Sequence, residues 1–429
     1  MKIQLIHLNL LNRKRIVNRN FAGEQPCLPL LYLAAGLQID GHEVEYIEAV
    51  AGKPETYMPQ FAISQPDCVG FTSYAANWKH NTDAIGAMRA SRPKTTFIVG
   101  GFHASHNTES ILHNDSAPDV VFAGEAEESI REWAKIFDYR SSWINVAGLY
   151  IKQDREIVFT GERRPPTDLD KLPFPAWELV DPFRYRPAPG YSSRKPHASI
   201  VGSRGANNGL NCSTLPSETR LRSAEHILEE INWLNRYHNV KDIYFIDESI
   251  LYFPERTQGI CESVISRKID LTWVANTSVA EVKPEILKLM HRAGCKQLLF
   301  RLGSGVQKNL DTLGKEFTIE QSRSAVRMTN DTKILAHGVF TLGIPGETFD
   351  EAIRTIEFAR SLNLRHSTFE YFTPYPGTAI YEKLIESNSG LILPDSSFDT
   401  ETPSFIPKDM TIENMINLKI SSRKRFHIK

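Results

Sequence analysis

Short apolar runs alternate with amphipathic stretches over the first third of the chain. Four of these runs have the length and composition of buried strands: residues 2–10, 42–50, 67–74 and 95–101. The periodicity predicts helices at 28–41 and 81–92, and a short strand followed by a helix within 119–137. Regular strand–helix alternation predicts an α/β domain with a doubly wound parallel sheet and helices on both faces.

The same alternation returns in the second half, with six predicted strands at 198–203, 242–249, 271–279, 295–305, 334–347 and 366–375. Between the two halves lies a hairpin-like pair of strands followed by a proline-dense stretch, which disfavours helix and sheet. We therefore predict four parts, namely a sheet domain (1–138), a linker (139–197), a second α/β domain (198–385) and a tail (386–429).

The composition mainly excludes classes of partner, membrane spans, zinc sites and disulfides. A net charge of −1 gives no electrostatic reason to expect a nucleic-acid or membrane-surface partner, and no apolar run approaches the ~18 residues of a membrane span. The first apolar run precedes the basic cluster, the reverse of a signal peptide. Five scattered cysteines without C-x2-C spacing argue against zinc and disulfides. These features predict a reduced, cytoplasmic protein without a bound metal ion.

Three segments follow strands of the predicted first sheet: Thr72–Ala75, Gly100–Ala104 and Gly124–Glu127. Ligands of open parallel sheets bind at the carboxyl ends of the strands, where these segments meet. Gly100 and Gly101 leave room for a flat ligand to approach the backbone, although the same pair is equally consistent with a tight turn.

The sequences GGFHAS (100–105), GEAEES (124–129) and PLLYLAAGLQIDGHEVEYIEA (29–49) resemble the cobalamin-binding domain that precedes many radical S-adenosylmethionine (SAM) domains. The resemblance implies cobalamin as cofactor and a set of contact residues: Thr72, Ser73, Ala75, Asn77, Gly100, Gly101, Phe102, His103, Ala104, Gly124 and Glu125. The D-x-H-x-x-G motif is absent, so no protein histidine is expected on cobalt and His103 is expected at the corrin edge. A domain retained only as a scaffold is the alternative.

Ser203-Arg204-Gly205 resembles the start of a radical SAM domain, where C-x3-C-x2-C normally follows and holds a four-iron cluster. The three ligand positions here are Ala206, Leu210 and Ser213, and Cys212 is the one nearby thiol. A single thiolate does not satisfy a cluster that needs several cysteine ligands, so no iron–sulfur cluster is expected. G-I-P-G-E-T (343–348) and Y-P-G-T (375–378) also match this family, and the resemblance implies an open six-stranded (β/α)6 barrel.

The ends of the barrel strands supply the catalytic candidates Asp247, Glu248 and Arg301. The acidic pair could act in acid–base or substrate chemistry, or cap a helix. Relatives usually have G-x-E-S-G where this chain has Arg301-Leu302-Gly303-Ser304-Gly305, so the glutamate that helps hold SAM is missing.

Arg301 suits a carboxylate or phosphate. If it faces the barrel lumen, Asp247 or Glu248 is its expected partner, but strand alternation could also point it outward. The resemblance adds Ser304 and Gly343 as cofactor contacts.

Two functions remain open. The chain could catalyse a non-radical, cobalamin- or SAM-linked reaction such as methyl transfer to a small metabolite, with an outside reductase as partner. Alternatively, it could be an inactive subunit that binds cobalamin or a metabolite beside an active enzyme. A radical SAM enzyme with unusual cluster ligands is a third hypothesis, which the single Cys212 disfavours.

Overall fold

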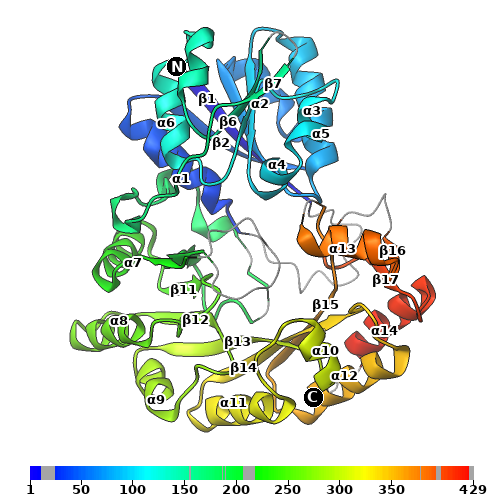
Figure 1. Cartoon of the computed structure of the whole chain (residues 1–429). Helices are drawn as coiled ribbons and strands as arrows, with labels where there is room; N and C mark the ends of the chain where they lie inside the picture. The colour runs from blue at the N-terminus through cyan, green and yellow to red at the C-terminus, as the bar shows by residue number, and fades with distance from the viewer. Residues whose placement is uncertain are drawn as a thin grey trace.

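The computed structural model describes residues 1–10, 25–153, 156–185, 187–188, 190–205, 218–376, 378–392 and 398–424. A sheet domain formed by the N-terminal part of the chain lies above a barrel-like domain, and the linker and the C-terminal segments lie between and beside them (Figure 1). The predicted cluster-ligand positions 206, 210 and 213 fall outside the described residues.

The N-terminal sheet has the strand order β2-β1-β3-β4-β5-β6-β7. Its strands are β1 (Lys2–Asn9), β2 (Glu43–Val50), β3 (Cys68–Thr72), β4 (Thr96–Gly100), β5 (Val120–Phe122), β6 (Leu149–Gln153) and β7 (Glu156–Phe159). The helices are α1 (Leu28–Ile39), α2 (Met58–Ser64), α3 (Trp78–Ser91), α4 (Phe102–His106), α5 (Thr108–Leu112) and α6 (Glu127–Lys135). The first five strands are parallel, which confirms the doubly wound prediction, and the hairpin β6–β7 extends the sheet in antiparallel fashion.

The second sheet has the order β15-β14-β13-β12-β11-β8, and all its strands are parallel. Its strands are β8 (His197–Ile200), β11 (Asp242–Phe245), β12 (Thr272–Thr277), β13 (Cys295–Gly303), β14 (Leu335–Leu342) and β15 (His366–Tyr371). The helices are α7 (Ala224–His238), α8 (Pro254–Ser266), α9 (Pro284–Arg292), α10 (Gln307–Thr312), α11 (Ile319–Asp331) and α12 (Phe349–Ser361). The helices lie along one side of the curved sheet (Figure 1), so the predicted open six-stranded barrel is confirmed.

Alternation along β13 separates two faces of this barrel. Leu298, Phe300 and Leu302 belong to the apolar core shared with the helices, and define the outer face. Leu299 instead packs with Tyr244, Val274 and Tyr191 on the opposite, inner face. Side chains two residues from Leu299 along β13 therefore also point into the barrel.

Short elements join the two domains. The linker contains the 3-10 helices η3 (Leu169–Lys171), η4 (Trp177–Leu179) and η5 (Pro182–Arg184), and the ribbon β9 (Ser203–Arg204)–β10 (Arg220–Leu221) flanks the segment 206–217. Trp177 is buried and donates its indole N–H to Glu230 at 2.9 Å, which fixes the linker on α7.

The C-terminal segment comprises α13 (Ala379–Ser387), β16 (Gly390–Ile392), β17 (Phe405–Pro407) and α14 (Ile412–Lys424). Met415 and Leu418 of α14 are buried in the barrel core, so the tail packs onto the outer face. In the described part of the chain, no helix is long and apolar enough to cross a membrane.

Candidate functional site

The end of β3 is fixed by the Asn77 side chain, which donates to the Thr72 carbonyl at 3.1 Å and accepts from the Tyr74 N–H at 2.8 Å. Ser73 follows the strand, and its backbone N–H donates to the Gly100 carbonyl at 2.8 Å. Its hydroxyl is buried without a hydrogen-bond partner among the described residues. A buried unsatisfied hydroxyl at a strand end is a natural contact for a ligand. Ala75 is half-buried in the same segment.

The Gly-Gly segment allows close packing at Gly101, which favours the tight-turn alternative for this residue. Gly101 has φ +104°, and a Cβ there would lie 3.0 Å from the Ser73 carbonyl oxygen and 3.1 Å from the Thr72 hydroxyl. At Gly100 the nearest atoms to a Cβ belong to Phe122, at 3.6 Å. Glycine at 101 therefore lets the ends of β3 and β4 meet.

Phe102, His103 and Ala104 form the start of the short helix α4, where an irregular loop was expected. Ala104 is fully buried, and the Phe102 ring stacks on His106 at 4.8 Å between ring centroids. Burial lowers the pKa of His103 to about 4, with a further contribution from His106. The imidazole of His103 is therefore neutral and buried, and its role as a corrin-edge contact stays a prediction.

Open space is found instead at Gly124, after β5. It has φ +71°, and no atom lies within 4 Å of a Cβ placed there. The open backbone at Gly124 and the unpartnered hydroxyl of Ser73 lie at the carboxyl edge of one parallel sheet. This edge fits a flat, polar macrocycle such as cobalamin.

Glu125 forms an ion-pair network between the two domains. Its carboxylate accepts from Arg204 at 3.0 Å and from Arg220 at 3.2 Å, and Arg204 also pairs with Glu127 at 2.5 Å. Arg220 is 6% exposed and also donates to the Pro166 carbonyl at 2.6 Å. Glu125, predicted as a cofactor contact, thus fastens both ends of the segment 206–217 to the N-terminal domain.

Asp247 follows β11 and is saturated by protein groups. It accepts from the N–H groups of Gly202 at 2.6 Å and Ser203 at 3.1 Å, and pairs with Arg256 at 2.8 Å. Its side chain is fully buried. Asp247 therefore holds the chain where β8 leads into the ribbon, whereas its neighbour Glu248 is exposed.

Arg301 points to the inner face, because it lies two residues after Leu299 and in register with Val339 of β14. Its partner is Glu370 of β15 at 3.8 Å, which corrects the expected pairing with Asp247 or Glu248. The Arg301 side chain remains 62% exposed. Nearby on the inner face, the Tyr244 hydroxyl donates to Asn276 at 3.0 Å.

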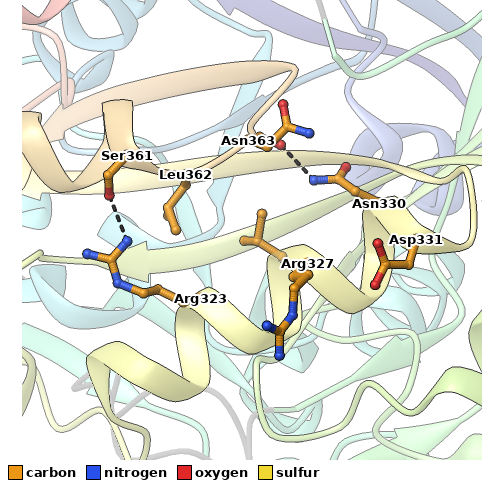
Figure 2. A pocket seen from close by; sticks show the side chains of 8 residues that line it. Arg323, Arg327, Asn330, Asp331, Ser361, Leu362 and Asn363 are labelled. Carbon is orange, nitrogen blue, oxygen red and sulfur yellow. Dashed lines mark hydrogen bonds between the residues drawn. The ribbon is translucent and has the colours of Figure 1, made fainter.

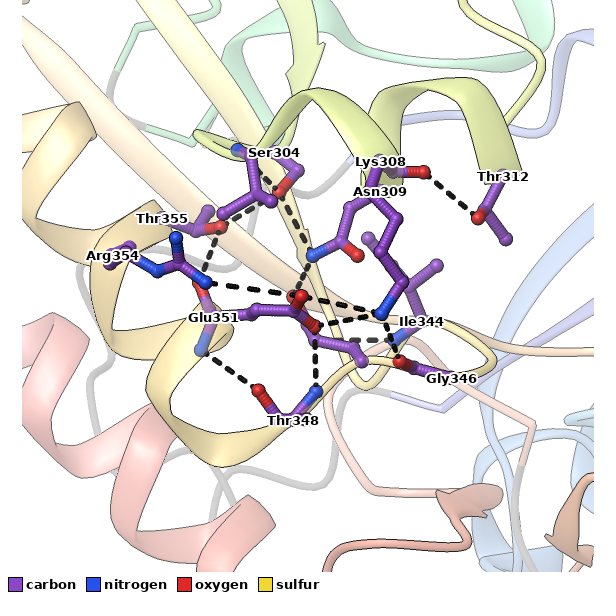
Figure 3. Close-up of polar contacts among 12 residues, drawn as sticks. Ser304, Lys308, Asn309, Thr312, Ile344, Gly346, Thr348, Glu351, Arg354 and Thr355 are labelled. Atoms are coloured by element: carbon purple, nitrogen blue, oxygen red, sulfur yellow. Dashed lines mark hydrogen bonds and ion pairs between the residues drawn. The ribbon is translucent and has the colours of Figure 1, made fainter.

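Ser304 and Gly343 belong to a buried polar network, of which Figure 3 shows Ser304, Asn309 and Thr355. Ser304 exchanges a hydrogen bond with Thr355 at 2.8 Å, and the Gly343 N–H donates to the Glu347 carboxylate at 2.6 Å. Asn309 donates to the same carboxylate at 3.0 Å. Burial raises the pKa of Glu347 to about 7, against the effect of its backbone hydrogen bonds. Both predicted contact residues therefore have structural partners here.

Four of the five cysteines lie among the described residues, at 27, 68, 261 and 295, and all are buried and free. Burial raises the pKa of Cys27 and Cys261 to about 12, and raises that of the other two as well. Such thiols are inert. Among the described residues, no group of three or more His, Cys, Asp or Glu side chains is placed to hold a metal ion.

Glu370, Arg220 and Lys315 were not predicted as site residues. Glu370 could have been found from the sequence, since it lies one residue before the end of the strand β15, where barrel side chains meet ligands. A cavity of about 260 Å³ lies away from all of them, between α11 and the end of α12, where Arg323 donates to Ser361 at 2.8 Å (Figure 2). None of the predicted site residues lines that cavity.

Comparison with known families settles the nature of both domains. Residues 14–134 match the B12-binding domain, and residues 204–359 match the radical SAM superfamily. The chain therefore carries a B12-binding domain and a radical SAM domain. The family resemblance seen in the sequence is confirmed to that extent.

Relatives and solved structures extend the match along the chain. An uncharacterized methyltransferase of Pyrococcus horikoshii is 26% identical over 437 residues, covering 100% of this chain and 94% of the relative. The radical SAM methyltransferase TsrM of Kitasatospora setae, solved with cobalamin and a [4Fe-4S] cluster, has TM-score 0.70 at 16% identity over 92% of this chain and 76% of its own. The cobalamin-dependent SAM radical enzyme OxsB, solved with aqua-cobalamin and SAM, has TM-score 0.69 at 17% identity over 98% and 61%. At these identities the two solved structures show that this chain shares their fold.

Proposed function

We propose that this chain uses cobalamin to transfer a methyl group from SAM to a small metabolite without a four-iron cluster. The observation that carries the proposal is a contrast within the molecule. The carboxyl edge of the first sheet keeps open space at Gly124 and an unpartnered hydroxyl at Ser73. The segment between Arg204 and Arg220 contains one cysteine, Cys212, whichever alignment of the motif is used.

The donor atoms present do not fit a cluster, because such clusters are generally held by several cysteine thiolates. The four thiols outside the segment are buried and protonated, so they are poor metal ligands. Two-electron methyl transfer needs no electron from a cluster. SAM becomes S-adenosylhomocysteine, and the acceptor gains the methyl group and loses a proton.

Cobalamin, when bound, supplies a nucleophilic metal that can take a methyl cation and pass it on. The protein's own groups hold the two domains together for this purpose. Glu125 and Glu127 tie the ribbon to the B12-binding domain, and Asp247 fixes the start of the ribbon. The inner face of the barrel offers the exposed Arg301 to the acceptor. An external reductase remains part of the proposal, since the cobalt must be kept reduced.

The test is anaerobic purification with iron, sulfide and cobalamin supplied, followed by metal analysis and a single-turnover assay with SAM and chemically reduced cobalamin. We expect cobalamin retention, less than one iron per chain, and S-adenosylhomocysteine release that is unchanged in Cys212→Ser. About four irons and four sulfides per chain, with release of 5′-deoxyadenosine, would overturn the proposal. Retained cobalamin without S-adenosylhomocysteine would instead support an inactive cobalamin-binding subunit.

A further inference from the structure

The inner face at the end of β13 carries a weakly held guanidinium. Arg301 is 62% exposed, and its contact with Glu370 is a single approach of 3.8 Å. Exposed, non-bidentate pairs of this kind contribute little to stability. Arg301 therefore makes only a weak ion pair with Glu370 in the free protein, and its guanidinium is available to a ligand.

A second cation lies beside it where the family resemblance places a glutamate. Position 303 is glycine with φ +70°, and a Cβ there would lie 3.0 Å from Leu313 Cδ1 and 4.0 Å from Lys315 Cε. The Lys315 side chain thus runs over the backbone of Gly303. The strand end therefore carries an ammonium group beside position 303 and no carboxylate at that position.

Lys315 has no compensating partner in the described part of the chain, where no carboxylate lies within 4.0 Å of its Nζ. Burial and, to a lesser extent, the charge of Arg301 lower the pKa of Lys315 to about 8, while the exposed Glu248 partly opposes both. A lysine that is still mainly protonated near pH 7 and is repelled by the charge of an arginine is in an unfavourable position. An anion between the two cations would relieve it.

We propose that Arg301 and Lys315 together bind an anionic oxygen group of the methyl acceptor, either a carboxylate or a phosphoryl group. The guanidinium fork gives two parallel hydrogen bonds, and the ammonium adds a point charge from the second side. Glu370 releases Arg301 to the ligand and remains close enough to accept a hydrogen bond from a neighbouring donor on it. The anion-binding site itself does not depend on the proposed function. Only the statement that the anion belongs to the methyl acceptor rests on it.

Direct binding tests this site without cobalamin or SAM. Inorganic phosphate would be titrated by phosphorus NMR line broadening, and glutarate by saturation-transfer NMR, against the full-length protein at pH 7. We expect at least one probe to bind. Arg301→Gln and Lys315→Gln should each weaken that probe roughly 10- to 100-fold, the range for a charged hydrogen bond. Lys296→Gln, at the opposite end of β13, is the control and should not change binding.

The variant Lys315→Arg distinguishes loss of the positive charge from loss of the fold. Wild-type affinity should fall as the pH rises through about 8, whereas Lys315→Arg should bind as well at pH 7 and keep its affinity at pH 9. Far-ultraviolet circular dichroism checks that each variant is folded. Binding of phosphate alone or glutarate alone would identify the anion.

If neither probe binds, or if Arg301→Gln and Lys315→Gln behave like Lys296→Gln, the site is wrong. Neither result affects the S-adenosylhomocysteine assay, which judges methyl transfer separately.

Discussion

The ion pairs of Glu125 should carry much of the coupling between the two domains, and Glu125→Gln tests this directly. The substitution keeps the shape of the side chain but leaves Arg220, which is 6% exposed, facing an uncharged amide. Breaking a buried pair by removing one partner costs about 3–5 kcal/mol. Because Glu125 is 17% exposed and Arg204 retains Glu127, we expect a loss of about 2–3 kcal/mol.

The assay is urea unfolding at pH 7, followed by tryptophan fluorescence, together with limited proteolysis of the linker. Glu128→Gln is the matched control, since Glu128 is the third residue after Glu125, is 53% exposed and pairs with Arg163 at 3.1 Å. A pair this exposed contributes at most about 1 kcal/mol. The protease should also cleave the linker faster in Glu125→Gln than in wild type, because the ribbon no longer binds the first domain.

The pH dependence gives the sign of the effect. Burial alone would raise the pKa of Glu125, but hydrogen bonds and charges from Arg220 and Arg204 hold it below its usual value of 4.5. A lowered carboxyl pKa stabilises the fold above the unfolded-state pKa and loses that contribution as the pH falls through the folded-state pKa. The difference between wild type and Glu125→Gln should therefore be full near pH 7 and shrink below about pH 4.5. Equal stability of Glu125→Gln and Glu128→Gln at pH 7 would refute the reasoning.

Three further outcomes are expected. Gly124→Val should abolish cobalamin retention, and its φ of +71° should also cost about 1–3 kcal/mol of stability. Gly101→Ala should lower the free energy of unfolding by about 1–3 kcal/mol through strain against β3 but leave cobalamin retention in place, and reversed effects on cobalamin retention in spectral titrations would contradict this assignment. Asp247→Ala should cost at least about 3 kcal/mol in urea unfolding, since it strands the buried Arg256, and a stable but inactive variant would point instead to catalysis. Because burial raises the pKa of Glu347, the wild type should lose stability relative to Glu347→Gln as the pH rises from about 4.5 through 7, and parallel pH–stability curves would disprove it.

The sequence was enough to predict the parallel strands of both sheets and their alternation with helices, although the hairpin β6–β7 was assigned to the linker and lies in the first sheet. Period-2 and helical patterns report which face of an element is buried, and a parallel sheet needs a crossover after each strand, so regular alternation left few other folds. The family motifs added the B12-binding and radical SAM domains. They did so because turns such as 343–348 depend on local backbone geometry, visible here as Glu347 accepting from the N–H groups of Gly343 and Ile344.

Which residues meet depends on how distant segments pack in the folded protein. Arg301 and Glu370 are joined across β14, and Glu125 and Arg220 lie 95 residues apart, so no local pattern records either pair. Gly101 and Gly124 are the same residue type after neighbouring strands, but the first packs against β3 and the second faces open space. Charge partners and free volume depend on the packing of distant segments, whereas periodicity records only burial along one element.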